Sequence, residues 1–426
     1  MHIIVSKVRR KALFNNIKVF MKINLIKVLW QVTRSISIFL PKNPKQGLLL
    51  FPSDLKNIVG ALGDDAMLTS TIDAYLSKYS DGNIYIVCRS EAVSVVKGMG
   101  YHPIVIESYA LHRFVFWAFG VIRSIQPRYV ACLGADVMDG YYGYAHPVMT
   151  IVFSDLASKS GASVVVLGGS FNANPLGMLR YFYNNLSSKV SVYMRDDISL
   201  TRFLKFSKFK AQLVADSAFN LKKSVAPSEV ASWIYAEKNK GNSILGFNIH
   251  PMLVKNIDGA TLDLLIQQSE IALEQFADKN VSVLFMPHDY RGKDGDATCL
   301  EPLERRCRAK LSCYYLGGVH SAATLKAIAA ELDAVVTGRM HLAIAALGCG
   351  VPVLSVTYQD KFEGLYRHFK LSEEWLVTPE SLMKGSSFNT KLVSFVDEAD
   401  ALRDHIGREL KSVLDLSKKN YSFFKK

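Results

Sequence analysis

The stretch Asp333-Ala-Val-Val-Thr-Gly-Arg-Met-His-Leu-Ala-Ile-Ala-Ala-Leu-Gly-Cys-Gly-Val-Pro-Val-Leu-Ser-Val-Thr357 predicts a strand, a helix and a second strand in succession. It opens with an apolar run that ends at Thr337, and residues 342–347 are rich in Ala and Leu, which favour helices. Gly348 suits a helix C-terminus, and Pro352 follows as a stop signal. The β-branched residues after it are typical of a buried parallel strand. The stretch is therefore a βαβ unit.

Polar groups occupy the turn at the start of this predicted helix. Gly338, Arg339 and His341 stand there, where unpaired backbone N–H groups and the positive end of the helix dipole attract anions. Arg339 adds a fork of N–H donors that matches a carboxylate or a phosphate, and His341 titrates near neutral pH. Both residues could instead be structural, but ligands of open α/β sheets bind at the carboxyl ends of the strands. The turn is therefore a candidate binding site.

The rest of the chain repeats this pattern of apolar strands that end in polar loops. Helical patterns separate most of the strands, which indicates α/β architecture with doubly wound parallel sheets. The predicted strands are 48–51, 83–88, 103–106, 129–133, 163–167, 190–194, 243–249, 281–286, 313–316, 333–337 and 353–356.

Composition limits the classes of protein that fit. The chain has 426 residues, 49% of them hydrophobic and 21% charged, enough for two globular domains. The six cysteines form no Cys-x-x-Cys pair, so a zinc ribbon or a redox motif is not indicated, and reduced thiols in a cytoplasmic protein are expected. The net charge is +13, but ten basic residues precede the first acidic one, Asp54. The remaining body is close to neutral, and we expect no nucleic-acid partner.

The basic leader, residues 1–46, carries lysines at helical spacing among Phe, Ile, Leu and Trp. This pattern is typical of a helix lying at a membrane surface, because charges interrupt every apolar run before it reaches a transmembrane length. A helix packed on the body and a mitochondrial-type presequence are the alternatives. The sequence thus predicts peripheral contact with the inner face of the cytoplasmic membrane and leaves these alternatives open.

Five segments are expected along the chain: a basic amphipathic segment (1–46), a first Rossmann-like domain (47–220), a linker region (221–242), a second Rossmann-like domain (243–375) and a C-terminal helical segment (376–426). Pro227 and a polar amphipathic stretch suggest the linker. The C-terminal segment is helical and charged, and we expect it to pack back on the first domain.

Further candidate residues stand at other strand ends. Asp64 follows Gly63 at the start of a predicted helix, where it or Asp65 could serve only as a cap. Arg195 follows a strand and could instead pair with Asp196 or Asp197. His250, His288 and His341 could line one rim, but they lie on three separate loops, so we expect no metal site.

Three blocks of sequence together resemble the polysaccharide pyruvyl transferase family. These blocks are Gly63-Asp-Asp-Ala-Met-Leu68; Arg195-Asp-Asp-Ile-Ser199; and Gly338-Arg-Met-His341 with Gly350-Val-Pro-Val353 and Tyr358-x-x-Lys361. The resemblance covers roughly residues 47–375. The chain departs from the family pattern at Ala61, where the family has Asn, and has only Gly134 and Asp136 in place of a glycine cluster.

The resemblance implies two Rossmann-like, doubly wound domains that face a cleft, as in GT-B glycosyltransferases. It also implies transfer of pyruvate from phosphoenolpyruvate to two hydroxyls of a sugar in an exopolysaccharide or cell-surface glycan precursor, forming a ketal and requiring no cofactor. The expected catalytic residues are His341 with Asp64 or His288. The expected substrate-binding residues are Arg339, Arg195, Lys361, Gly63, Gly338 and Asp136.

The main alternative is a GT-B glycosyltransferase that uses a nucleotide sugar, in which the same turn would hold a diphosphate. A binding or scaffold protein without activity is a third possibility. Under the first reading the partners are phosphoenolpyruvate and a glycan acceptor, which the resemblance suggests is carried on a lipid.

Overall fold

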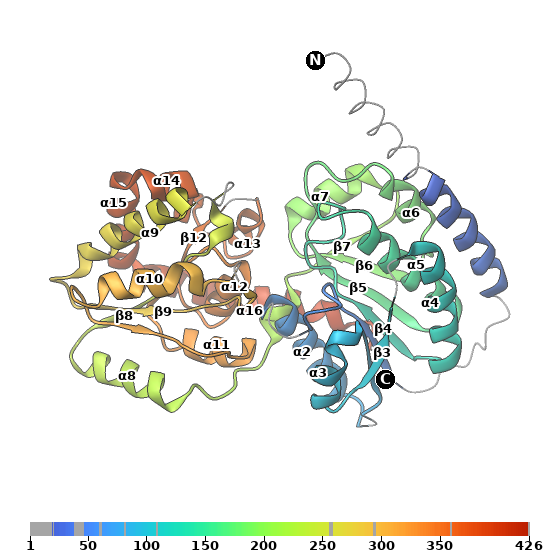
Figure 1. Cartoon of the computed structure of the whole chain (residues 1–426), viewed down its shortest axis with the longest axis horizontal. Coiled ribbons are helices and arrows are strands. Elements are labelled where there is room, and N and C mark those ends of the chain that lie inside the picture. Colours follow the sequence, from blue (N-terminus) through green and yellow to red (C-terminus); the bar gives the residue numbers. More distant parts are fainter. Residues whose placement is uncertain are drawn as a thin grey trace, which may run out of the picture.

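The chain folds into two α/β domains placed side by side (Figure 1). The computed structural model describes residues 19, 21–37, 47–58, 62–80, 82–107, 110–254, 259–292, 295–357 and 360–424. Each domain has one parallel sheet with helices on both faces. This arrangement confirms the predicted α/β fold with two Rossmann-like domains.

The first domain contains a seven-stranded sheet in the order β3-β2-β1-β4-β5-β6-β7. Its central strands β1 and β4 are buried along their whole length, because helices cover both faces of the sheet. The strands are β1 (Leu48–Phe51), β2 (Ile84–Cys88), β3 (His102–Val105), β4 (Tyr129–Cys132), β5 (Ser163–Gly169), β6 (Val190–Met194) and β7 (Gln212–Leu213). The covering helices include α2 (Leu62–Leu76), α3 (Val93–Gly98), α4 (Leu111–Ile125), α5 (Ala145–Lys159), α6 (Leu179–Asn185) and α7 (Asp197–Phe206).

The second domain contains a six-stranded sheet in the order β10-β9-β8-β11-β12-β13. The strand order reverses between β8 and β11, as it does between β1 and β4 in the first sheet, and such switch points are where ligands bind. The strands are β8 (Ser243–Asn248), β9 (Val281–Phe285), β10 (Cys313–Tyr315), β11 (Ala334–Thr337), β12 (Val353–Val356) and β13 (Leu376–Val377). The helices include α8 (Ser228–Asn239), α9 (Gly259–Leu273), α10 (Ala297–Cys307), α11 (Ala322–Ala329), α12 (Met340–Leu347), α13 (Phe362–His368), α14 (Pro379–Lys384) and α15 (Ser386–Asp397).

Two segments differ from the expected organisation. The region 221–242, expected to be a linker, contains α8, which packs on the second domain through buried Val230 and Ile234 and through Trp233 against Tyr314. The segment from 376, expected to be helical, begins with strand β13 at the edge of the second sheet. Both differences have one cause: a short strand and a weakly apolar helix acquire their structure from tertiary packing.

Buried polar contacts join the two domains. The Lys326 ammonium on α11 is 4% exposed and donates to the carbonyl oxygens of Phe219 and Leu221, 2.8 Å from each. In the other direction, the Asp65 carboxylate on α2 accepts the Ala322 N–H at 2.9 Å, at the start of α11. These contacts fix the helices that border the space between the domains.

The end of the chain returns to the first domain, as Figure 1 shows for α16 (Ala399–Lys418). Asn420 is fully buried there, accepts the Gly168 N–H at 3.0 Å and donates to the Ala215 carbonyl at 2.8 Å. Phe423 and Phe424 pack against Tyr129. The C-terminal segment therefore fastens the second domain to the first.

A helix over residues 21–36 packs on the outer side of the first domain, beside α5 and α6 (Figure 1). Trp30 is fully buried, stacks on Phe182 and donates its indole N–H to Asp155, and Arg34 pairs with the same carboxylate at 3.4 Å. Of the expected basic segment, residues 1–18, 20 and 38–46 lie outside the described residues. Within the described part of the chain, no helix has the length and apolar character needed to cross a membrane.

Candidate active site

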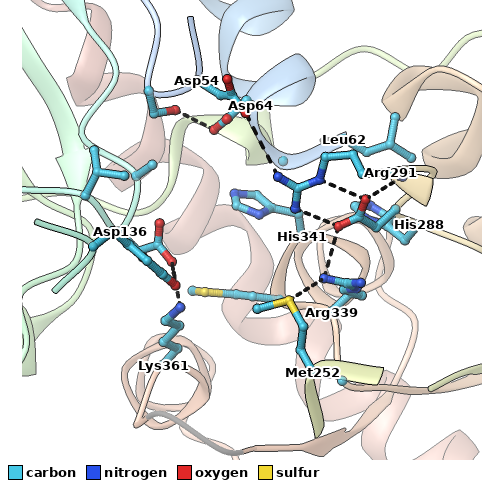
Figure 2. Close-up of a pocket in the computed structure, with 18 of the residues that line it drawn as sticks. Asp54, Leu62, Asp64, Asp136, Met252, His288, Arg291, Arg339, His341 and Lys361 are labelled. Carbon is cyan, nitrogen blue, oxygen red and sulfur yellow. Dashed lines mark hydrogen bonds and ion pairs between the residues drawn. The ribbon is translucent and has the colours of Figure 1, made fainter. Parts of the chain in front are cut away.

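A cavity of about 670 Å³ lies between the two domains, where the carboxyl ends of their strands meet. The nine residues that the sequence nominated all line it: Gly63, Asp64, Asp136, Arg195, His288, Gly338, Arg339, His341 and Lys361. They come from both domains and span almost 300 positions of the chain. Figure 2 shows Asp64 and Asp136 on the side of the first domain, facing His341, Arg339 and Lys361 from the second.

His341 stands in the first turn of α12, directly against the backbone of α2. A Cβ atom added to Gly63 would lie 2.3 Å from Nδ1 of His341, so only glycine allows this approach. On its other side, Nε2 of His341 lies 3.7 Å from Oδ2 of Asp216, a fully buried carboxylate. Burial opposes ionisation of Asp216, but His341 and Arg195 outweigh it and lower its pKa to about 2. A permanent negative charge therefore faces the imidazole.

Asp64 faces the cavity from the first turn of α2. Burial raises the pKa of its carboxyl to about 6, against the lowering effects of the Ser53 hydroxyl and the His341 imidazole. The Ser53 hydroxyl donates to Oδ1 of Asp64 at 2.5 Å. Asp64 therefore changes charge near neutral pH, which suits a group that exchanges protons with a substrate.

Arg339 is held by two carboxylates of its own domain. Its Nε and Nη2 atoms donate to Oδ1 of Asp296 at 2.9 and 2.6 Å, and Nη1 lies 3.2 Å from Oδ2 of Asp289. The preceding Gly338 packs on His250, whose Nε2 would lie 2.8 Å from an added Cβ atom. His250 is fully buried behind this turn. The guanidinium is thus fixed in position before any ligand binds.

Arg195 lies deeper, at the end of β6, and is 3% exposed. It pairs with Asp216 at 3.2 Å and donates to the Ser170 hydroxyl at 2.9 Å. Arg195 does not pair with Asp196 or Asp197, which was the structural alternative. Asp196 caps α7, and Asp197 pairs with Arg367. Through Asp216, Arg195 shares a carboxylate with His341.

Lys361 reaches across the cavity from the start of α13 to the first domain. Its ammonium donates to Oδ2 of Asp136 at 2.6 Å. Burial would raise the pKa of Asp136, but Lys361 and Arg195 dominate and lower it to about 2. This ion pair closes one side of the cavity (Figure 2).

His288 and Arg291 line the opposite side, on the loop after β9. Burial, together with the charges of His341 and Arg339, lowers the pKa of His288 to about 3, so this imidazole is neutral at physiological pH. Arg291 pairs with Asp289 at 2.7 Å and reaches Asp54 of the first domain at 4.0 Å. Sequence reasoning did not nominate Arg291 or Asp289. Their position at a strand end, in the segment Pro287-His-Asp-Tyr-Arg291, was the available signal.

A metal site is not formed by the part of the chain that the structure describes, since no three His, Cys, Asp or Glu side chains are grouped to hold an ion.

Comparison with solved structures shows the same overall fold, the GT-B arrangement, in proteins that share little sequence with this chain. Alr3699/HepE from Anabaena in complex with UDP and glucose has a TM-score of 0.55 at 13% identity, covering 89% of this chain and 98% of that one. The UDP-GlcNAc 2-epimerase from Methanocaldococcus jannaschii has a TM-score of 0.54 at 12% identity, covering 83% and 92%. The Neisseria meningitidis 2-epimerase bound to UDP-GlcNAc has a TM-score of 0.51 at 11% identity, covering 88% and 100%. At these identities the likeness concerns the fold alone.

No curated protein matches this sequence. The family model for polysaccharide pyruvyl transferase does match it, over residues 62–360. This range extends from the first turn of α2 to the residue before Lys361 and spans most of the cavity wall. The chain therefore belongs to the polysaccharide pyruvyl transferase family.

Proposed function

We propose that this protein transfers the pyruvyl group of phosphoenolpyruvate to two hydroxyls of a sugar in a cell-surface glycan precursor, forming a pyruvate ketal. The observation that carries the proposal is the meeting of Asp64 and His341 in a cavity that also holds four fixed cations. Family membership supplies the pyruvyl group and the polysaccharide acceptor.

The donor we propose carries a phosphate and a carboxylate on a three-carbon frame. Arg339, Arg291 and Lys361 border the cavity at 13, 42 and 14% side-chain exposure, each held by a carboxylate. The carboxylates fix these cationic groups at the cavity wall, where the phosphate and carboxylate of the donor would meet charges that are already in place. No side chain caps the N-terminus of α12, which adds a further attraction for an anion.

In the proposed reaction, His341 is the general acid and Asp64 the general base. His341 gives a proton to C3 of phosphoenolpyruvate, and the negative Asp216 stabilises its imidazolium form before transfer. A sugar hydroxyl then adds to C2 and gives its proton to Asp64. The C2–O bond to phosphate then breaks, and phosphate leaves with its electron pair and takes the proton from Asp64. The second hydroxyl adds to C2 and gives its proton to His341, which closes the ketal and restores both groups. His288 is a poor candidate for the base, because its pKa of about 3 makes it a weak one.

Purified protein incubated with phosphoenolpyruvate should release phosphate only when a glycan acceptor is present. The product should gain a ketal, visible as a new methyl signal by NMR.

The second candidate function, transfer from a nucleotide sugar, is favoured by the fold likeness to proteins solved with UDP or UDP-GlcNAc. If the protein releases UDP from a UDP-sugar, and releases no phosphate from phosphoenolpyruvate with any acceptor, the nucleotide-sugar function replaces the one we propose.

Gly63→Ala should separate activity from stability. The added methyl group would meet His341 Nδ1 at 2.3 Å and push the imidazole away, so turnover should fall by about 10²-fold, the scale of losing a general acid. Gly63 is the second residue of α2 and has an ordinary helical backbone that alanine also adopts, so we expect the variant to fold. Gly120→Ala in α4, where an added Cβ meets nothing within 4 Å, is the matched control and should keep full turnover. Normal turnover in Gly63→Ala, beside an inactive His341→Ala, would refute the positioning role.

The pH dependence of activity should report on Asp64. Because a general base must be ionised, kcat/KM should fall as the pH drops below about 6. The Ser53 hydroxyl lowers the pKa of Asp64, so Ser53→Ala should move this acidic limb to higher pH. The Asp54 carboxylate raises the pKa of Asp64, so Asp54→Asn should move the limb to lower pH. Limbs that coincide in all three proteins would assign the titration to another group.

We also propose that the N-terminal helix brings the enzyme to an anionic membrane, where its acceptor is carried on a lipid. The helix has two apolar stripes. One, with Ile23, Ile26 and Trp30, is buried on the body. The other points away and exposes between 48 and 65% of each of its side chains: Met21, Leu25, Val28, Val32 and Ile36. Ten basic residues and no acidic one precede Asp54, and apart from Arg34, which pairs with Asp155, they match an anionic surface. Membrane contact and packing on the body are therefore compatible.

Val28→Glu should weaken binding to vesicles that contain phosphatidylglycerol by roughly tenfold or more. The change removes an apolar side chain that would be buried in the lipid, and its carboxylate is repelled by the anionic headgroups. Val225→Glu is the control. It makes the same change at a valine that is 87% exposed and stands before α8, away from the N-terminal helix in the sequence, and this variant should bind vesicles like wild type. Binding should also fall with salt. Equal vesicle binding by the two variants would count against a lipid surface. So would a Val28→Glu variant that binds vesicles like wild type but is monomeric where wild type is a dimer, because the exposed stripe would then be a contact between two copies of the chain.

A further inference from the structure

Two exposed tyrosines stand on the loop that follows β4; Tyr142 lines the cavity, and Tyr141 packs against the ring of Tyr142. Tyr141 is 61% exposed and Tyr142 is 55% exposed, and their ring centroids are 5.0 Å apart at an interplanar angle of 85°. Large aromatic side chains left in water at the edge of a polar cavity often mark a contact surface. The mechanism proposed above uses neither of them.

The loop holds these rings in a defined place. The Asp139 carboxylate, 1% exposed, accepts the Tyr141 N–H at 2.8 Å and the Asn172 N–H at 2.9 Å. Gly140 and Gly143 have φ values of +82° and +114°, which side chains with a Cβ rarely adopt. The tyrosines are therefore presented by a braced turn.

A second hollow of about 390 Å³ adjoins the main cavity at this loop and shares Tyr142 and His146 with it. Burial lowers the pKa of His146 to about 4, so its imidazole is neutral. Its Nε2 atom is buried and has no hydrogen-bond partner among the described residues. A buried polar atom of this kind costs free energy until a ligand or a water molecule pairs with it.

Tyr142 also links the hollow to the reacting groups. Its hydroxyl donates to Oδ2 of Asp136 at 3.2 Å, and the same oxygen accepts from Lys361. A ligand resting on the Tyr142 ring would therefore extend toward the cavity that holds Asp64 and His341.

We infer that Tyr141, Tyr142 and the adjoining hollow form the subsite for a pyranose ring of the acceptor glycan. The C–H face of a pyranose stacks on an aromatic ring, while its hydroxyls need hydrogen-bond partners such as Nε2 of His146. The inference rests on the proposed function for the identity of the ligand as an acceptor, but sugar binding itself does not require the transfer reaction.

The test is saturation-transfer NMR of methyl glycosides of glucose, galactose, mannose and N-acetylglucosamine, with no donor present. Wild type should bind at least one of them, and Tyr142→Ala should bind it roughly tenfold more weakly, on the scale of a lost aromatic contact. Tyr142→Phe keeps the ring and should retain most of the binding. Tyr235→Ala, at a 70% exposed tyrosine on α8, is the matched control.

These outcomes separate the subsite from the reaction. Sugar binding that depends on Tyr142, in a protein that releases no phosphate from phosphoenolpyruvate, would uphold the subsite and overturn the proposed function. In an active enzyme, Tyr142→Ala should raise the KM for the acceptor, whereas Tyr142→Phe, which loses the same hydroxyl bond to Asp136 but keeps the ring, should not. No binding of any of the four glycosides, or equal binding by Tyr142→Ala and wild type, would overturn the subsite.

Discussion

The site depends on one close contact, in which the imidazole of His341 rests on the backbone of Gly63. The two residues belong to different domains, and no side chain, not even a methyl group, fits between them. Because of this contact, Asp64 and His341 reach the same cavity from opposite walls. The contact persists only if α2 and α12 keep their positions, and the buried bonds of Lys326 and Asp65 hold the neighbouring helix α11 against the first domain. Lys326 and Asp65, which do not line the cavity, thus help to set the distance between His341 and Gly63.

The electrostatics of the cavity follow a second rule: each cation is matched by a carboxylate. The pairs are Arg339 with Asp296 and Asp289, Arg291 with Asp289, Arg195 with Asp216, and Lys361 with Asp136. Four unpaired cations in one cavity would repel one another and would be mobile, whereas paired ones are fixed and cost less to bury. The carboxylates therefore do not argue against an anionic donor. They hold the cationic groups in place, so that an anion entering the cavity would meet charges that are already positioned.

Most of the fold could be predicted from the sequence, since buried parallel strands read as continuous apolar runs that end in polar loops. The edge strands β7 and β13 are two residues long and leave no such pattern. The site was predictable only in part. Strand ends pointed to Arg195, Arg339 and His341, but their partners, Asp216, Asp289 and Asp296, lie 21 to 125 positions away from them. Spacing carries no information on such pairs, so the ion pairs that decide how each cation is used appear only in three dimensions.

The N-terminal helix carries apolar residues in two different environments that the sequence pattern does not distinguish. In the sequence, its apolar residues stand on several sides of the predicted helix, and the pattern does not say which of them contact the body. The structure divides them into a stripe that Trp30 locks onto Asp155 and Phe182, and an opposite stripe in water. A helix fixed in this way cannot roll its buried stripe toward lipid without breaking those contacts. If the outer stripe meets a membrane, the orientation of the whole enzyme is then set by the packing of Trp30, and the cavity mouth is held at a constant angle to the surface that carries the acceptor.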